Sequence, residues 1–398
     1  MIEIKEKEKC CGCTACYSIC PNHCIEMTAD AEGFLYPQIN KEQCVNCGLC
    51  ERVCPMINKQ SVSLKERETV VLRTKDRNIL LDSTSGGFFT NIAECIIEAG
   101  GVVCGAAYDE NYKVIHSFLT KENSDELYKF RGSKYVQSNM GDCFARIKKE
   151  LQSGRKVCFI GTTCQVSGLK AYLGKEYNEL LAVDLVCHGV PSPKLWNKYL
   201  AYQKKEYNAR IRKVSFRNKT YGYHSGTMKI EFEDGKTYFG SARVDYMLKS
   251  FFSEIASRPS CYQCPFKSVN RCSDFTLFDS WHAADLVQGL KDDDRGYTNV
   301  IIQSDKAKKY MEKLGEYYEI FKADTQKAIA LDGIMIENSA VPHKCRNEFY
   351  KELDENELTQ HIQKFIPVSK KDKLIEASKG VVYRMGIYNL IHRIIRRK

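Results

Sequence analysis

The sequence predicts an α+β protein in which a small cysteine-rich module precedes a mixed α/β domain that contains a β-rich excursion. Two observations predict this fold class: a cysteine pattern repeats within the first 60 residues, and strand-like runs alternate with helical patterns from residue 69 onward. The 398 residues are too many for one small core, and a hydrophobic content of 43% supports a globular chain. We therefore expect three units, at residues 1–60, 68–320 and 321–398.

The repeat consists of two runs with the spacing C-x2-C-x2-C-x3-C-P, which begin at Cys10 and, 34 residues later, at Cys44. This is the bacterial ferredoxin pattern, in which three closely spaced thiolates bind one 4Fe-4S cluster and the fourth cysteine binds the other cluster. Zinc is the alternative, but zinc sites usually use paired CxxC motifs on longer loops. The spacing assigns Cys10, Cys13, Cys16 and Cys54 to one cluster (cluster I) and Cys44, Cys47, Cys50 and Cys20 to the other (cluster II).

A polar linker at residues 58–67 leads into the second domain. Runs rich in β-branched residues predict strands at 102–108, 156–160 and 180–186, and helical periodicity predicts helices at 88–99, 140–153 and 194–206. The excursion at 210–241 is predicted from alternating runs joined by the turn signal Glu233-Asp-Gly235. A helix at 245–256 and a final strand-helix unit at 299–314 complete the expected elements.

Four more cysteines of this domain, Cys164, Cys187, Cys261 and Cys264, come from three separate segments. Four thiolates are enough for one further 4Fe-4S cluster. One CxxC with two scattered cysteines is equally typical of a zinc site or of buried thiols, so the residues alone leave these alternatives open. No ligand role is assigned to Cys11 or Cys24, and core or surface roles are expected for Cys95, Cys104, Cys143, Cys158, Cys272 and Cys345.

Short motifs then occur in one order: Ser83-Thr-Ser-Gly-Gly87, Gly132-Ser-Lys-Tyr135, Gly161-Thr-Thr-Cys164-Gln165, Cys187-His-Gly189, Cys261-x-x-Cys264 and the segment from Asp274 to Trp281. This series resembles the beta subunit of coenzyme F-420 hydrogenase and dehydrogenase over residues 68–315. The first module resembles an extension found on bacterial members. The resemblance implies FAD in this domain and favours a third 4Fe-4S cluster on Cys164, Cys187, Cys261 and Cys264. This chain departs from the family in one segment. The family usually has a glycine close before the position of Trp281, whereas this chain has Phe278 there, and the ring would close part of the flavin or substrate pocket.

The flavin site implied by the resemblance also has a physical argument. Ser85, Gly86 and Gly87 precede an apolar helix, so backbone N–H groups can approach a pyrophosphate at the positive end of that helix. A plain capped helix start is the alternative. Gly132, Ser133, Lys134 and Tyr135 offer a turn, a cation and a ring, and the further candidates for flavin contacts are Gln165, Gly296, Tyr297 and Thr298. His188 is a candidate proton donor, with a structural role as the alternative.

The net charge of +10 is concentrated at the C-terminal end, where residues 370–398 hold nine lysines or arginines against Asp372 and Glu376. No nucleic-acid motif accompanies this charge, so no nucleic-acid partner is expected. Residues 381–398 form a basic amphipathic pattern that fits packing on the body of the protein, a membrane surface or a partner. Because the start MIEIKEKEK is no signal peptide and no apolar run is long enough to span a membrane, we expect a cytoplasmic protein, either free or held at the inner membrane surface by this tail.

Clusters and a flavin on one chain predict an oxidoreductase, because clusters carry single electrons and a flavin converts between one- and two-electron steps. We expect ferredoxin or another redox protein as the donor and a small organic molecule as the acceptor. Three alternatives are a non-catalytic relay subunit of a larger redox complex, an enzyme acting on a deazaflavin coenzyme, and a flavin-free iron–sulfur scaffold at a membrane. The family resemblance further implies an anaerobic bacterial setting near polysaccharide synthesis.

Overall fold

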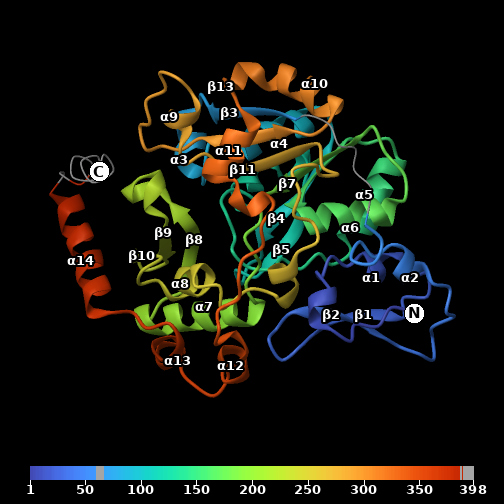
Figure 1. The fold of residues 1–398 in the computed structure, drawn as a ribbon, viewed down its shortest axis with the longest axis horizontal. Coiled ribbons are helices and arrows are strands. Elements are labelled where there is room, and N and C mark those ends of the chain that lie inside the picture. Colours follow the sequence, from blue (N-terminus) through green and yellow to red (C-terminus); the bar gives the residue numbers. More distant parts are fainter. Residues whose placement is uncertain (60–66, 386–387, 389–398) are drawn as a thin grey trace.

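A computed structural model describes residues 1–59, 67–385 and 388 (Figure 1). The N-terminal module holds two short helices and one antiparallel hairpin of two strands. Each helix follows a residue in the left-handed region, Thr14 with φ of 68° and Gly48 with φ of 72°, at the same place in the two cysteine runs. The elements are η1 (Lys7–Lys9), α1 (Ala15–Ile19), β1 (Ile25–Ala29), β2 (Leu35–Ile39) and α2 (Leu49–Arg52).

The second domain is built on an eight-stranded mixed sheet with the strand order β13-β3-β12-β11-β7-β6-β4-β5. Its centre, from β11 through β7 and β6 to β4, is parallel, and the remaining pairs are antiparallel. Parallel strands bring their carboxyl ends to one edge, where the following loops meet. The strands are β3 (Glu68–Thr74), β4 (Val102–Tyr108), β5 (Val114–Leu119), β6 (Val157–Thr162), β7 (Leu180–Leu185), β11 (Phe275–Asp279), β12 (Thr298–Ile302) and β13 (Tyr318–Ala323).

Helices cover both faces of this sheet. On one face, α4 (Phe88–Glu98) and α10 (Asp305–Leu314) pack their apolar residues against β3, β4, β6, β7 and β12. On the other face, α5 (Cys143–Gln152) and α6 (Thr163–Leu173) pack against β4, β6 and β7, and this cluster includes Cys13 and Ala15 of the N-terminal module. The module is therefore part of the packed body.

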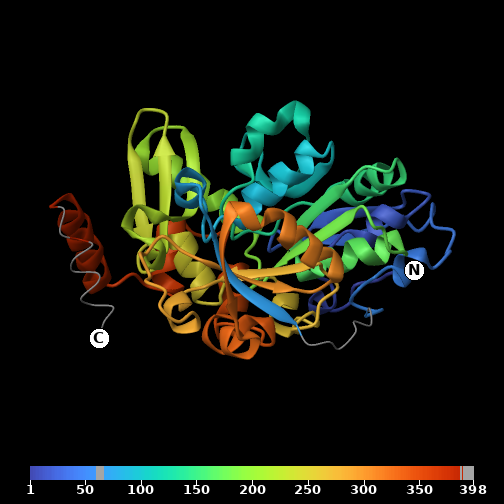
Figure 2. The same cartoon turned by 90° about the horizontal axis from the view of Figure 1, so that it is seen from above.

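A separate three-stranded antiparallel sheet, in the order β10-β9-β8, lies beside the large sheet (Figure 2). Its apolar face packs with helices on the buried Trp196, which is 1% exposed. This sheet and its neighbours are β8 (Ile211–Asn218), β9 (Thr227–Phe232), β10 (Thr237–Ser241), α7 (Pro193–Tyr207), α8 (Tyr246–Phe252), η5 (Pro259–Gln263), α12 (Arg346–Lys351) and α13 (Leu358–Phe365). The remaining elements are η2 (Lys121–Lys129), η3 (Lys219–Tyr221), η4 (Tyr223–Ser225), α3 (Arg77–Asp82), α9 (Ala283–Leu286), η6 (Gly315–Tyr317), α11 (Thr325–Asp332), η7 (Ile334–Ile336) and α14 (Lys370–Arg384).

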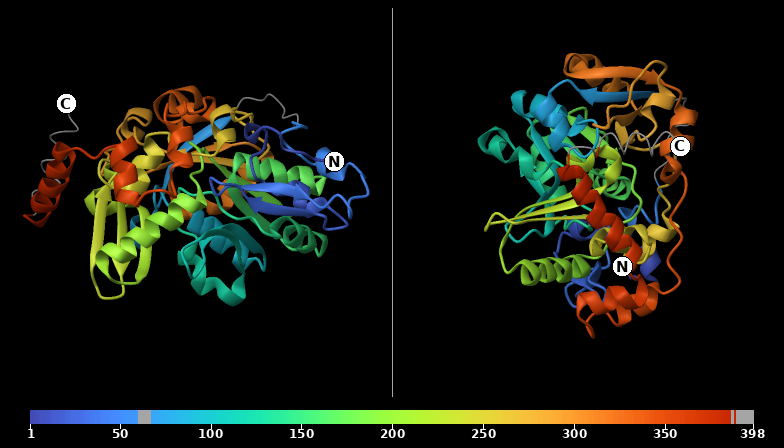
Figure 3. Two further views of the ribbon diagram at one scale, coloured as in Figure 1. Left: turned by 90° about the horizontal axis from the view of Figure 1, so that it is seen from below. Right: turned by 90° about the vertical axis from the view of Figure 1, so that its left-hand side faces the viewer.

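The predicted fold class is confirmed, and most predicted elements lie within a few residues of observed ones. The predicted excursion at 210–241 corresponds to the three-stranded sheet, and the predicted helix at 245–256 is shorter, because it ends at Phe252. Most of the predicted linker and of the basic tail lie outside the described residues. Residues 381–384 of the tail belong to α14, at the opposite end of the molecule from the N-terminal module (Figure 3). Within the described ranges, no helix has the length and apolar character to cross a bilayer.

Candidate functional site

The predicted ligands of cluster II converge. Cys20, Cys44, Cys47 and Cys50 line one small hollow at the outer end of the module. Cys47 is exposed, and the side chain of Val45 beside it is 66% exposed. Cys24, which has no predicted role, lines the same hollow with its Sγ 3.3 Å from Cys20 Sγ. This cluster site therefore reaches the protein surface.

The predicted ligands of cluster I lie on the inner side of the module. Cys13, Cys16 and Cys54 are buried. Burial, together with the neighbouring sulfurs of Cys10 and Cys54, raises the pKa of Cys16 to about 12. A bound iron would hold these thiols in the thiolate form that their own environment disfavours. Cys13 lies directly against α6, where a Cβ on Gly168 would approach its Sγ to 2.9 Å.

The third cysteine set also comes together. Cys164 follows β6 and Cys187 follows β7, so these two parallel neighbours deliver both thiols to one edge of the sheet. Cys261 and Cys264 come from η5 and its end, and all four cysteines line one hollow of about 40 Å³. Cys11 and Met56 of the N-terminal module line it too. Four thiols around one space are the donor set that a 4Fe-4S cluster requires.

In the described ranges, no group of three or more His, Cys, Asp or Glu side chains is close enough to hold a single metal ion.

Two cations that were not predicted also line the third hollow. The Nζ of Lys267 donates to the carbonyl oxygens of Cys187 and Met335, both at 2.7 Å. Arg271 pairs with Asp184 at 3.1 Å. Because Asp184 neutralises Arg271, the positive charge beside this hollow is that of Lys267, which favours an anionic group such as a thiolate-bound cluster. No local motif marks either residue.

A larger cavity of about 480 Å³ lies beyond the third hollow. Most of the residues predicted to contact a flavin line it: Ser85, Gly87, Gly132, Ser133, Lys134, Tyr135, Gln165 and Thr298. The two spaces share a wall, because Thr162, Cys187, His188, Gly189 and Val190 line both. Phe278 also lies on the cavity wall, as its departure from the family pattern suggests.

The start of α4 faces this cavity. Its N-cap residue Gly87 has φ of 85° and no side-chain cap, and a Cβ there would lie 2.7 Å from Thr74. The helix therefore starts at a glycine N-cap, which leaves its first N–H groups without a side-chain acceptor. Uncapped N–H groups at a helix N-terminus attract a phosphate. Gly86 does not contribute such a group, because its N–H donates to Thr298 Oγ1 at 2.8 Å.

Gly296 and Tyr297 do not line the cavity. The ring of Tyr297 is buried against Val71 and Ala283, on the side away from the cavity. The carbonyl of Tyr297 accepts a hydrogen bond from Ser85 Oγ at 2.5 Å. Gly296, at φ of 94°, has no space for a Cβ because the Tyr223 ring is within 2.8 Å. Tyr297 therefore holds Ser85 through its carbonyl oxygen, and Gly296 packs against Tyr223.

The loop from Gly132 to Tyr135 is rigidly held. Ser133 N donates to Thr84 Oγ1 at 2.8 Å, which joins this loop to the one before α4. Lys134 Nζ donates to the carbonyls of Phe130, Arg131 and Gly132, and burial lowers its pKa to about 7. The Tyr135 ring stacks on Phe251 with centroids 4.5 Å apart.

The side chain of Gln165 is equally fixed. Its Oε1 accepts from Thr162 N and its Nε2 donates to Ser138 Oγ, both at 2.9 Å.

His188 lies at the shared wall and bonds through Nε2 to the carboxylate of Glu254. Glu254 has φ of 58°, a conformation that costs free energy in a non-glycine residue and is common at functional sites. Its Oε2 is buried and finds no hydrogen-bond partner among the described residues. The pair can hold a proton next to the cavity. Glu254 could not be found from the sequence, because it lies 66 residues from His188 and belongs to no motif.

The far wall carries two further polar pairs that were not predicted. Arg217 pairs with Asp279 and lies over the Trp281 ring at 4.4 Å. Asp332, whose carboxylate is buried, bonds to the half-exposed His282 at 2.7 Å. Arg217, Asp279, Trp281 and Asp332 all line the cavity. These groups give this wall charged side chains, and the Trp281 ring on it stacks on Tyr223 with centroids 4.4 Å apart.

Comparison with known families matches both parts of the chain. Residues 154–326 match the family that comprises the C terminus of the coenzyme F-420 hydrogenase/dehydrogenase beta subunit, and residues 9–57 match the 4Fe-4S dicluster domain. Among solved structures, a chain from the xenon-derivatised F-420-reducing [NiFe] hydrogenase complex of Methanosarcina barkeri is similar, with 18% identity and a TM-score of 0.41, over 64% of this chain and 81% of that one. A search of curated proteins gave no match.

Proposed function

We propose that this chain, which carries the C-terminal domain of the coenzyme F-420 hydrogenase/dehydrogenase beta-subunit family behind a 4Fe-4S dicluster domain, is an iron–sulfur flavoprotein oxidoreductase. It takes electrons from ferredoxin or a similar redox protein and delivers them, through three 4Fe-4S clusters and FAD, to an organic acceptor. The three domains are taken as residues 1–60, 68–320 and 321–398.

The observation that carries the proposal is the order of the four candidate sites. The cluster II hollow opens at the surface, cluster I cysteines lie against the body, and the third hollow is lined by both domains. The cavity with the predicted flavin contacts shares a wall with that third hollow. Independent metal sites need not follow one another through a protein. An electron path, in contrast, requires that each site lie next to the following one, as these four sites do.

When bound, clusters supply single-electron transfer and a flavin supplies the change to two-electron chemistry. The chain's own residues have simpler tasks. Twelve cysteines would bind iron, and the N–H groups at the N-terminus of α4, whose N-cap Gly87 has no side chain to accept from them, would bind the phosphates. Tyr135 would place an aromatic ring beside a planar group, and the His188–Glu254 pair would hold a proton next to it.

The test is anaerobic purification of the full chain followed by measurement of iron, sulfide and flavin on the same sample. About twelve iron atoms and one FAD per chain are expected, because each cluster holds four irons. About eight irons without flavin would contradict the third cluster and the flavin together. Cys187→Ser is expected to lose about four irons, whereas the matched control Cys158→Ser, a buried core thiol, is expected to lose none.

Turnover then separates an enzyme from a relay subunit. The reduced chain alone is expected to reduce a small acceptor in a screen that includes coenzyme F-420, the coenzyme in the description of the matching family. A chain that binds FAD and all clusters but reduces only protein partners would instead be a relay.

A further inference from the structure

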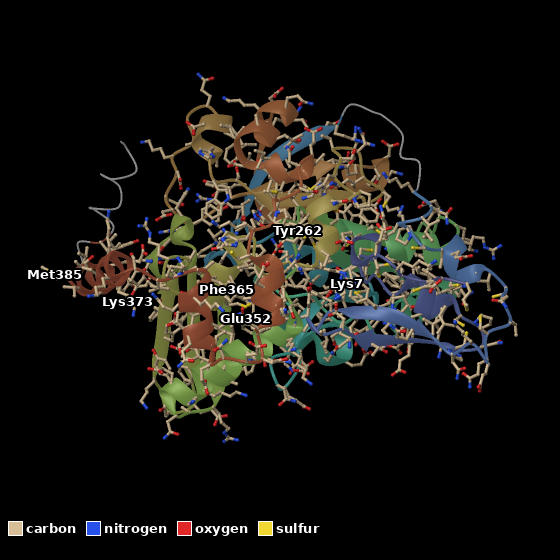
Figure 4. The ribbon with its side chains drawn as sticks, turned by 60° about the horizontal axis from the view of Figure 1, so that its bottom comes forward. Lys7, Tyr262, Glu352, Phe365, Lys373 and Met385 are labelled. Carbon is tan, nitrogen blue, oxygen red and sulfur yellow. The ribbon has the colours of Figure 1, made fainter. Side chains whose placement is uncertain are left out.

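Arg258 joins the two domains at their point of contact. It is 0% exposed and directly precedes η5, the segment that supplies Cys261. Its backbone is fixed by hydrogen bonds to Val190 and from Cys261, at 3.0 and 2.9 Å. Figure 4 shows Tyr262 of η5 between the module, marked by Lys7, and the C-terminal helices, marked by Glu352 and Phe365. The Arg258 side chain reaches from this position into the module.

The guanidinium bonds mainly to neutral oxygens. Its Nε donates to the Cys10 carbonyl at 2.8 Å, and its two terminal nitrogens donate to the Leu35 carbonyl at 3.0 Å and to Gln137 Oε1 at 2.9 Å. One terminal nitrogen also lies 3.5 Å from Cys10 Sγ, a predicted ligand of cluster I. Gly12, at φ of 71°, permits this approach, since a Cβ there would lie 2.9 Å from the guanidinium.

Other buried arginines of this protein are neutralised in a different way. Arg217, Arg271 and Arg346 each pair with a carboxylate, from Asp279, Asp184 and Glu32 respectively. In the described part of the chain, no carboxylate forms an ion pair with Arg258. A buried charge without a counter-charge costs several kcal/mol, so a group of opposite sign is required nearby. The predicted thiolate of Cys10 is the group in contact.

We propose that Arg258 is the buried counter-charge of the cluster held by Cys10, Cys13, Cys16 and Cys54, and that its N–H···S bond raises the reduction potential of that cluster. The inference rests on the proposed ligand assignment. Arg258 is a positioning residue: it acts on the cluster through Cys10 and through its charge. Hydrogen bonds to the sulfurs and net charge are known means by which proteins set these potentials.

The direction follows from charge. Reduction adds one electron to an already anionic group, and a fixed cation beside it stabilises the reduced form more than the oxidised one. One-electron transfer from the exposed cluster II oxidises that cluster and reduces cluster I. A higher potential at cluster I favours this inward step. Arg258 thereby has two roles: it holds the module against the second domain, and it sets the reduction potential of cluster I.

The test is a redox titration of the purified holoprotein followed by electron paramagnetic resonance, with iron and sulfide measured on each sample. Cys16→Ser identifies the signal of cluster I. For Arg258→Gln we expect the reduction equilibrium of that signal to shift about tenfold toward the oxidised form, which is about 59 mV for one electron. Arg258→Lys keeps the charge and is expected to shift less. Arg346→Gln is the matched control, because it removes a buried arginine from the same domain contact without touching a cysteine sulfur.

Full iron content with an unchanged potential in Arg258→Gln would overturn the proposal, as would an equal shift in Arg346→Gln. If Arg258→Gln loses iron, Arg258→Lys decides: a lowered potential supports the proposal and a wild-type potential contradicts it. Absence of iron from the wild-type module would instead contradict the ligand assignment, and so the proposed function itself.

Discussion

At the scale of single residues, Cys24 lies where it can replace a ligand. Its Sγ is 3.3 Å from Cys20 Sγ, and both line the cluster II hollow. We expect Cys20→Ala to retain the wild-type iron content, because Cys24 supplies a thiolate from nearly the same position. The double variant Cys20→Ala with Cys24→Ala is expected to lose about four irons. Iron and sulfide analysis measures both. Loss of four irons in the single variant would show that Cys24 cannot reach the cluster.

The ionisation of Lys134 predicts that the affinity for FAD depends on pH. Burial lowers its pKa to about 7, and a bound phosphate would raise that pKa by favouring the ammonium form. FAD affinity is therefore expected to be full below pH 7 and to fall above it, by up to about tenfold per pH unit while Lys134 loses its proton. Fluorescence titration of the apoprotein between about pH 6 and 9 measures this.

In Lys134→Met, FAD binding is expected to be weaker at about pH 6 and independent of pH in this window. An unchanged pH dependence in that variant would exclude Lys134 as its source.

Residues within a motif could be predicted, and residues that act across the fold could not. Cysteine spacing is local, so it suffices to predict a ligand role for eight cysteines of the N-terminal module, four of which line one hollow. The role of Cys164, Cys187, Cys261 and Cys264 was predicted only with the family resemblance, and the structure brings these four around a second hollow. Cys11 sits next to ligand Cys10 in the sequence, but its place in the third hollow depends on how the module docks. The same holds for Arg258 and Glu254, whose partners are distant in sequence. A glycine such as Gly296 indicates a place where the backbone has no room for a side chain. The sequence does not tell whether a ligand or another part of the protein fills that space.

At the scale of helices and strands, the hydrophobic periodicity of a segment predicts whether it is a helix or a strand. The place of a strand in the sheet depends on which other strands it pairs with. The apolar pattern of residues 88–98 suffices for α4, and the turn at Glu233 to Gly235 suffices for the hairpin of β9 and β10. The position of β3 between β12 and β13 could not be predicted, since strands more than 200 residues away complete its pairing. Such contacts depend on tertiary packing that no local pattern records.

The cap of α8 gives a stability prediction. The buried carboxylate of Asp245 accepts from Leu248 N, Tyr199 OH and Tyr238 OH, and burial raises its pKa to about 6. The unfolded value is about 3.9, so the folded state binds more protons between about pH 4 and 6, and stability falls as pH rises through that window. The expected loss is on the order of 2–3 kcal/mol.

Asp245→Asn keeps a capping oxygen but carries no charge, so it is expected to lack this pH-dependent loss. Urea unfolding at about pH 4.5 and 7 measures the difference between the two proteins. Parallel pH profiles for wild type and variant would show that Asp245 stays charged throughout.

At the scale of the whole molecule, the module and α14 lie at opposite ends (Figures 1 and 3). The outer end of the module presents exposed Cys47 beside the apolar side chain of Val45, which is 66% exposed. An apolar surface around an accessible cluster suits transient contact with a redox protein, which needs only a small interface. Electron entry is therefore expected at this end.

Val45→Glu tests that entry point. A charge there is expected to weaken docking of reduced ferredoxin, so that the rate of cluster reduction at low ferredoxin concentration falls about tenfold, a cost of about 1.4 kcal/mol in binding. Reduction by dithionite is expected to be unchanged, because a small reductant needs no docking surface. Leu374→Glu is the matched control, since Leu374 is 72% exposed on α14 at the other end. Stopped-flow absorbance measures all three proteins. If Leu374→Glu slows reduction and Val45→Glu does not, electrons enter near α14 and the direction proposed for the path is wrong.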